Sequence, residues 1–242
     1  MNQHVLVIGA GGGIGKEVVA QLCDDTKVGT VHCVSRSELS KINDKQISYA
    51  FDSTDSDKVK EFIADISSQG IRFSKVICTT GVLHTSGDMA LKPEKRLEDI
   101  SSEQLTEYFR VNTIVPALWL KFLVKVMAKE GASITFFSAR VGSISENGLG
   151  GWYGYRASKA ALNMIVKTAS IEYKRRSANT ALACYHPGTV DTNLSKPFQS
   201  NVKPGKLFTS QFTVSQLLSI IDKFDTEQSP YYIDWEGKKI SY

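Results

Sequence analysis

The chain has 242 residues, of which 42% are hydrophobic and 22% charged, as in an ordinary globular protein with a sizeable core. The net charge of +4 is mild. Its one dense basic run, at 174–176, fits a solvated helix end, so we expect no nucleic-acid partner. The longest apolar stretch, 114–127, is interrupted by Lys121 and Lys125, which argues against a membrane span.

The cysteines are four in number and far apart, with no paired spacing for zinc or redox chemistry: Cys23, Cys33, Cys78 and Cys184. We therefore expect free thiols, a reducing compartment and no metal site. A strand begins within four residues of Met1, which leaves no room for a signal peptide. These features predict a cytoplasmic protein.

Apolar strand-like runs alternate with helical spacing along the whole sequence. The predicted order is strand 4–8, helix 14–23, strands 31–34 and 47–51, helix 58–66, strand 75–78, helices 103–109 and 113–128, strand 133–137, helix 153–175, strand 180–185, helix 214–224 and strand 231–233. Such alternation is typical of a parallel sheet covered by helices on both faces. No repeat or low-complexity linker interrupts it. We predict one α/β domain over residues 1–242, with a doubly wound sheet of about seven strands.

A glycine-rich turn, residues 9–15, joins the first strand to the first helix. Glycine allows close approach of a phosphate, and a helix N-terminus offers free N–H groups and partial positive charge. The strand–turn–helix context therefore predicts a dinucleotide site. Its binding residues would include Gly9, Gly11, Gly13, Ile14 and Gly15. The alternative is a flexible turn that needs glycine for its geometry alone.

The end of the second strand indicates which dinucleotide is bound. An NAD enzyme usually places an acid there for the ribose 2′-hydroxyl. This sequence has Ser35 and Arg36 instead, and a hydroxyl and a guanidinium suit a 2′-phosphate. We therefore expect NADP(H) in preference to NAD(H). The alternative is that Arg36 is a solvated loop residue.

Tyr155 and Lys159 form a Tyr-x-x-x-Lys motif within a predicted helix, so both side chains lie on one face. A phenol with a pKa near 10 is a poor proton donor and acceptor at neutral pH. A nearby ammonium favours the phenolate and lowers that pKa. Tyr153 is a weaker candidate because its fourth neighbour is Ala157. The motif predicts a catalytic pair.

The glycine spacing G-x-x-x-G-x-G, with Tyr155 and Lys159 downstream, resembles the short-chain dehydrogenase/reductase family over nearly the whole chain. The runs 138–144 and 150–153 look like its C-factor and sniffer-type carbonyl reductase branch. The resemblance implies a Rossmann fold. It also implies that Asn112 takes part in a water and proton relay, and that Lys159 holds the nicotinamide ribose.

Further cofactor contacts follow from the same resemblance. The segment after the sixth strand, P-G-x-x-x-T in the family, would flank the nicotinamide; its residues here include Pro187, Gly188, Val190 and Thr192. Asp52 and Ser53 resemble the family's adenine contact, although Asp52 could equally cap the next helix. Thr80 and Gly81 lie where the family often has N-N-A-G, and threonines can still contact the cofactor.

The family's serine, which hydrogen-bonds the substrate oxygen, is missing from its usual position. It normally lies three residues before a glycine, and counting back from Gly142 reaches Ala139. Ser138 lies one place early and is our preferred candidate for this catalytic role. Ser143 is the alternative. If neither reaches the substrate, polarising the carbonyl falls to Tyr155.

The resemblance implies hydride transfer between NADP(H) and a carbonyl or alcohol substrate, with Tyr155 as the proton donor. We expect a carbonyl reductase with pocket walls from His84, Leu149, Trp152, Tyr153 and Phe198. Relatives pair the helices predicted at 113–128 and 153–175 between subunits, which implies a homodimer or homotetramer. Two other functions stay open: a nucleotide-binding regulatory or signalling protein, and an epimerase or dehydratase.

Overall fold

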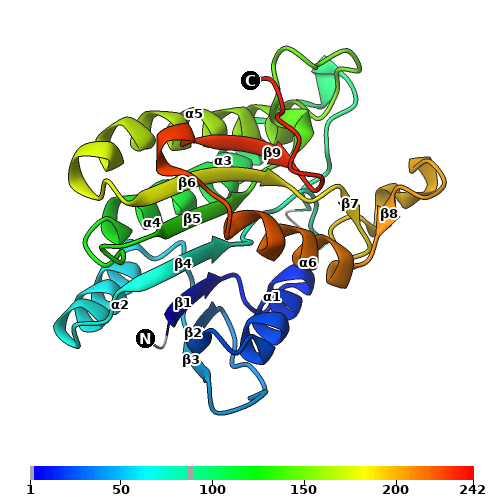
Figure 1. Cartoon of the computed structure of the whole chain (residues 1–242). Helices are drawn as coiled ribbons and strands as arrows, with labels where there is room; N and C mark the ends of the chain where they lie inside the picture. The colour runs from blue at the N-terminus through cyan, green and yellow to red at the C-terminus, as the bar shows by residue number, and fades with distance from the viewer. Residues whose placement is uncertain (1–2, 87–89) are drawn as a thin grey trace.

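Seven strands form a central, wholly parallel sheet in the order β3-β2-β1-β4-β5-β6-β9 (Figure 1). This computed structural model describes residues 3–86 and 90–242. The strands are β1 (Gln3–Ile8), β2 (Val28–Ser35), β3 (Gln46–Ala50), β4 (Phe73–Cys78), β5 (Ala132–Phe137), β6 (Thr180–His186) and β9 (Tyr231–Asp234). The order reverses at β1 and β4, the point at which doubly wound sheets bind ligands. The predicted single α/β domain with a seven-stranded parallel sheet is confirmed.

Helices cover both faces of the sheet (Figure 1). One face packs on α1 (Gly13–Asp24) and α6 (Ser210–Ile221), and the other on α2 (Ser56–Ser68), α4 (Val115–Leu123) and α5 (Tyr153–Arg176). The short helix α3 (Ser102–Phe109) packs on α5.

Strand β1 contributes apolar side chains to the core on both faces of the sheet. Val5 and Val7 belong to the cluster under α1 and α6, whereas Leu6 and Ile8 belong to the cluster under α2, α4 and α5. All four residues are fully buried. This follows from the two-residue period of a strand, because successive side chains point to opposite faces. A strand covered on both faces therefore reads as a continuous apolar run.

Helix α4 departs from its prediction at both ends. It was expected over 113–128, but a π-helical turn (Arg110–Ile114) precedes it and it ends at Leu123. The chain beyond Leu123 instead forms backbone hydrogen bonds with Phe73, the first residue of β4. Phe73 donates its N–H to Val126 O, and Ala128 donates its N–H to Phe73 O. Apolar residues at 124–128 thus continue the core without continuing the helix.

Smaller features were not predicted. A two-stranded parallel sheet joins β7 (Thr189–Val190) to β8 (Leu207–Phe208), and the 3₁₀ helix η4 (Lys196–Asn201) lies between them. Helix α6 begins at Ser210, earlier than the predicted 214, because the Thr209 side chain caps it by accepting the Phe212 N–H.

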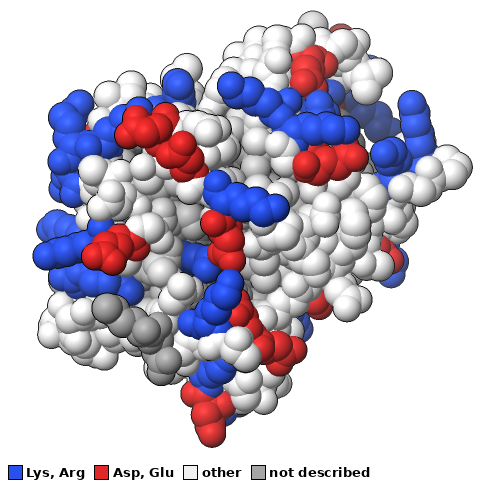
Figure 2. Space-filling model, in the orientation of Figure 1, with Lys and Arg blue, Asp and Glu red and all other residues white. Residues whose placement is uncertain are grey.

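No helix within residues 3–86 and 90–242 is both long and apolar enough to cross a membrane. On the face shown in Figure 2, basic and acidic side chains are interspersed.

Candidate active site

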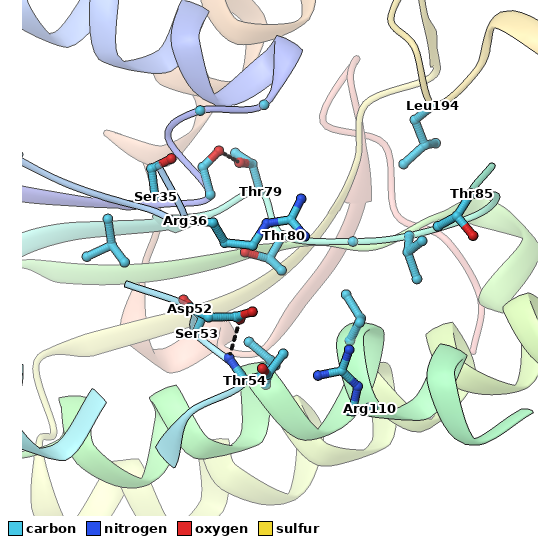
Figure 3. Close-up of a pocket in the computed structure, with 18 of the residues that line it drawn as sticks. Ser35, Arg36, Asp52, Ser53, Thr54, Thr79, Thr80, Thr85, Arg110 and Leu194 are labelled. Carbon is cyan, nitrogen blue, oxygen red and sulfur yellow. Dashed lines mark hydrogen bonds between the residues drawn. The ribbon is translucent and has the colours of Figure 1, made fainter. Parts of the chain in front are cut away.

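A pocket of about 480 Å³ lies at the carboxyl ends of β1, β2, β3 and β4 (Figure 3). Eight residues predicted to bind the cofactor line it: Gly9, Gly11, Ser35, Arg36, Asp52, Ser53, Thr80 and Gly81. Gly13, Ile14, Gly15 and Lys159 lie outside this lining. The structure therefore gathers residues from four strand ends, up to about seventy positions apart in sequence, around one cavity.

The glycine turn is packed too tightly for side chains. A Cβ on Gly11 would lie 2.5 Å from Ser35 Oγ, and one on Gly15 would lie 2.2 Å from the backbone oxygen of Gly9. The N-cap residue of α1 is Gly12, which has no side chain to cap the helix. Its first N–H groups and partial positive charge are therefore available to an anion. This cradle fits the pyrophosphate of a dinucleotide.

Arg36 projects into the pocket from the end of β2, beside Ser35 (Figure 3). Within the described chain Arg36 has no ion-pair partner. Asp52, from the end of β3, accepts a 2.9 Å hydrogen bond from the Thr54 N–H. Burial would raise the pKa of Asp52, but this hydrogen bond and the Arg36 charge bring the pKa below its ordinary value. Asp52 is thus an ionised acceptor at neutral pH.

Among the lining residues that the sequence analysis did not identify, Arg110 and Glu107 form an ion pair. Arg110 enters the pocket from the π-helical turn (Figure 3), and its guanidinium pairs with Glu107 at 2.6 and 2.8 Å. Arg110 belongs to no sequence motif, so its sequence context did not identify it as a pocket residue. Only the turn between α3 and α4 brings it opposite Ser35 and Arg36.

Helix α5 holds Tyr155 and Lys159 on one buried face, 8% and 3% exposed. Lys159 Nζ donates a 2.8 Å hydrogen bond to Phe137 O at the end of β5, and lies 5.8 Å from the centre of the Tyr155 ring. The Tyr155 ring packs edge-on against Tyr108 and Trp152. Its hydroxyl makes no hydrogen bond to any described residue. The predicted pair is thus brought together beside the strand ends.

Burial decides the protonation states of this pair. Burial raises the pKa of the Tyr155 hydroxyl, whereas we had expected Lys159 to lower it. Burial lowers the pKa of Lys159 to about 8. The expected phenolate is therefore disfavoured, because taking a charge out of water costs more here than the neighbouring ammonium returns. A protonated Tyr155 is suited to donating a proton.

Asn112 lies in the π-helical turn and is completely buried. Its Oδ1 accepts from the Val82 N–H at 2.8 Å, and its Nδ2 donates to Val82 O at 2.9 Å and to Ser158 Oγ at 3.1 Å. A Cβ on Gly81 would lie 3.4 Å from both Asn112 Oδ1 and Lys159 Nζ. Asn112 therefore fastens the segment after β4, which lines the pocket, to the helix that carries Tyr155 and Lys159.

The two candidate serines are engaged elsewhere. Ser138 Oγ donates to Asn163 Oδ1 at 2.7 Å, and Ser143 Oγ accepts from the Glu146 N–H at 3.2 Å. Ala139 instead belongs to the apolar cluster that surrounds Tyr155. The sequence alone placed Ala139 at the family's serine position, and the structure puts a methyl group beside the tyrosine.

The segment after β6 folds back toward the glycine turn. A Cβ on Gly13 would lie 3.0 Å from Thr192 Cγ2. Asn193 and Leu194 line the pocket, whereas Pro187, Gly188, Val190 and Thr192 lie outside the lining. The predicted nicotinamide segment therefore reaches the site through the two residues that follow it.

The predicted pocket wall is only partly assembled. His84 donates to Asn193 O at 2.9 Å and stacks edge-on with Phe198, whose ring centre lies 5.0 Å from that of Trp152. Leu149 was predicted to join them, but it is 94% exposed and points into solvent. That prediction is wrong. Leu149 lies in an exposed loop, followed by Gly150 and Gly151, which both adopt positive φ.

The sequence pattern of the family described as "short chain dehydrogenase" matches residues 3–203, and the chain belongs to this family of oxidoreductases, which bind a nicotinamide cofactor. A curated relative is 1-hydroxy-2-glutathionyl-2-methyl-3-butene dehydrogenase of Rhodococcus sp. (strain AD45). It is 28% identical over 236 residues, which cover 96% of each chain.

Two solved structures share the fold. Carbonyl reductase Sniffer of D. melanogaster has a TM-score of 0.85 at 20% identity, with both chains covered completely. The NADPH-bound carbonyl reductase from chicken fatty liver has a TM-score of 0.84 at 21% identity, covering 100% of this chain and 94% of the other. The predicted family is confirmed.

Proposed function

We propose that this protein is an NADP(H)-dependent carbonyl reductase in which Tyr155 donates the proton. The observation that carries the proposal is the buried Tyr155–Lys159 pair on α5, next to a pocket lined by the glycine turn and Arg36. Val82 belongs both to that pocket and to the cluster around Tyr155, so the two sites adjoin. The similar carbonyl reductases also support this assignment.

NADP(H) is the form of cofactor that the pocket suits. A 2′-phosphate needs a cation, and Arg36, which forms no ion pair with any described residue, offers a guanidinium next to the Ser35 hydroxyl. No acidic residue stands at the end of β2, where one would repel that phosphate. The NADPH bound to the chicken carbonyl reductase is consistent with the same choice.

When bound, the nicotinamide supplies the hydride that reduces the carbonyl carbon. Tyr155, kept protonated by burial, donates its proton to the carbonyl oxygen. Lys159 holds the nicotinamide ribose and returns a proton toward Tyr155, a role to which a pKa near 8 is suited. Asn112 keeps the Val82 segment against α5, and from that position serves the water relay that refills the proton.

The missing serine hydroxyl shapes the reaction. With Ala139 beside Tyr155, and Ser138 and Ser143 hydrogen-bonded elsewhere, the carbonyl oxygen is polarised by Tyr155. The surroundings are apolar and aromatic: Leu83, Leu91, Tyr108, Trp152 and Phe198. We therefore propose an apolar or aromatic aldehyde, ketone or quinone as substrate, reduced more slowly than by relatives that keep the serine.

Cofactor fluorescence during titration with NADPH and NADH tests the proposal, followed by turnover with aldehydes, ketones and quinones. We expect tighter binding of NADPH, and turnover that disappears in Tyr155→Phe while NADPH affinity stays. Tight NADPH binding without turnover on any carbonyl would favour the regulatory or signalling alternative. Binding of neither cofactor would refute the proposal.

We further propose a homodimer or homotetramer assembled through α4 and α5. A groove of about 390 Å³ runs between these helices, lined by apolar residues such as Leu120, Val124 and Ile165. Met164 in the same groove is 64% exposed, and Ile114 nearby along the chain is 51% exposed. Sedimentation velocity should find an oligomer that Met164→Asp dissociates. A monomeric wild type would refute this part.

A further inference from the structure

Glu94 is a buried carboxylate that the proposed chemistry does not use. It is 1% exposed, and it forms no ion pair with any residue of the described chain. Both of its carboxylate oxygens accept from the backbone N–H of Gly154, at 3.3 and 3.2 Å. Its own backbone oxygen accepts from the Trp152 N–H. Burying a carboxylate is costly unless its hydrogen bonds compensate, and those of Glu94 go to the start of α5.

Helix α5 needs such a partner because it lacks a cap of its own. Its N-cap residue is Trp152, which has a φ of 53° and makes no side-chain cap hydrogen bond. Its first turn contains no acidic residue. The first N–H groups of a helix require acceptors, and its N-terminus carries partial positive charge. Glu94 supplies both the acceptor and the negative charge from a separate segment. Tyr155 is the third residue of this helix.

The packing around Gly154 links Glu94 to the tyrosine. A Cβ at Gly154 would lie 2.8 Å from Glu94 Oε1 and 2.4 Å from Cδ2 of Tyr108. The Tyr108 ring in turn lies edge-on to Tyr155, with ring centres 6.3 Å apart. Its hydroxyl is fixed by a 2.7 Å hydrogen bond to Leu83 O. The first turn of α5 therefore packs tightly against Glu94 and Tyr108. Tyr155, which belongs to this turn, has little room to move.

The segment that carries Glu94 is itself anchored. The N–H groups of Lys95 and Arg96 both donate to Asp99 Oδ2, at 3.0 and 3.1 Å. The Lys92 N–H donates to Gln104 Oε1 on α3 at 2.8 Å. The carboxylate thus approaches Gly154 from a fixed support, which is what positioning another group requires.

We propose that Glu94 is the positioning residue for Tyr155. This inference rests on the proposed function. Glu94 holds the first turn of α5 in place so that the Tyr155 hydroxyl reaches the carbonyl oxygen. Displacing a reacting group by about 1 Å can cost on the order of a hundredfold in rate. Glu94 acts through the Gly154 N–H and does not itself touch substrate or cofactor.

The test compares Glu94→Ala and Glu94→Gln with Asp55→Ala. Asp55 caps α2 by accepting from the Asp57 and Lys58 N–H groups, so its loss is a matched cap deletion on a different helix. For each variant we would measure kcat, KM, the NADPH Kd and urea unfolding. In Glu94→Ala, kcat should fall about tenfold to a hundredfold, with the NADPH Kd unchanged within about twofold.

Glutamine should restore most of kcat, because its amide oxygen can accept from the Gly154 N–H. Asp55→Ala should lose about 1 kcal/mol of stability and keep its kcat. Wild-type kcat in Glu94→Ala, failure of glutamine to rescue, or an equal loss of kcat in Asp55→Ala would each overturn the proposal. A wild type without turnover on any carbonyl would refute the proposed function before any variant is compared.

Discussion

Replacing Lys159 by methionine should make the protein more stable while abolishing turnover. Burial lowers the pKa of Lys159 from 10.5 to about 8. Each pKa unit corresponds to about 1.4 kcal/mol, so keeping this ammonium charged in the folded state costs about 3 kcal/mol at neutral pH. Methionine removes that cost but also the 2.8 Å hydrogen bond from the ammonium to Phe137 O, and a hydrogen bond with a charged donor is worth about 1.5–3 kcal/mol. The net gain is at most about 1.5 kcal/mol, or roughly 6 °C in Tm.

The pH dependence of this gain has a definite sign. Between pH 8 and 10.5 the unfolded chain binds a proton that the folded chain has lost, so the wild type becomes more stable as pH rises through this window. The advantage of Lys159→Met should therefore be largest below pH 8 and shrink above it. Urea unfolding at several pH values measures both effects. Lys167→Met, exposed on the same helix, is the control and should show neither.

Two results would refute this reasoning. A Lys159→Met variant less stable than wild type at pH 7 would mean that the hydrogen bond to Phe137 O outweighs the cost of burying the charge. An advantage that stays constant above pH 8 would mean that the ammonium is not the source of the difference.

Three further predictions concern the pocket and the tyrosine. Arg36→Ala should weaken NADPH binding about tenfold to a hundredfold and leave NADH binding unchanged in fluorescence titrations; equal weakening would deny contact with the 2′-phosphate. Ala139→Ser should raise kcat about tenfold or more, whereas an unchanged kcat would show that a hydroxyl there does not reach the substrate. Gly15→Ala should abolish binding of both cofactors, because its Cβ would lie 2.2 Å from Gly9 O; retained binding would contradict the tight turn.

The Tyr155 environment shows where pattern reasoning stopped. The Tyr-x-x-x-Lys spacing places two side chains on one face of a helix whatever surrounds them. The direction of the Tyr155 pKa shift depends instead on burial by Leu83, Tyr108 and other residues from distant segments. The sequence therefore brought the two residues to attention, but it predicted the wrong direction for the shift of the Tyr155 pKa.

The pocket gives a similar contrast. Ser35 and Arg36 were recognisable because a parallel α/β sheet places binding residues after each strand. Arg110 and Glu94 carried no pattern of their own. Their roles arise from the π-helical turn before α4 and from a loop that reaches the start of α5. Leu149 was wrongly predicted to line the pocket because its apolar side chain did not reveal that it lies in an exposed loop.

The sequence by itself determined the strand and helix order, the glycine turn and the catalytic spacing. These features depend on hydrophobic periodicity and steric requirements among residues that are close together in the sequence. Only the tertiary structure decided which serine hydroxyls were already engaged, which charges were buried and what caps α5. Those properties depend on contacts between distant segments, such as Ser138 with Asn163 and Glu94 with Gly154. Long-range packing sets burial, and burial sets the chemistry of the site.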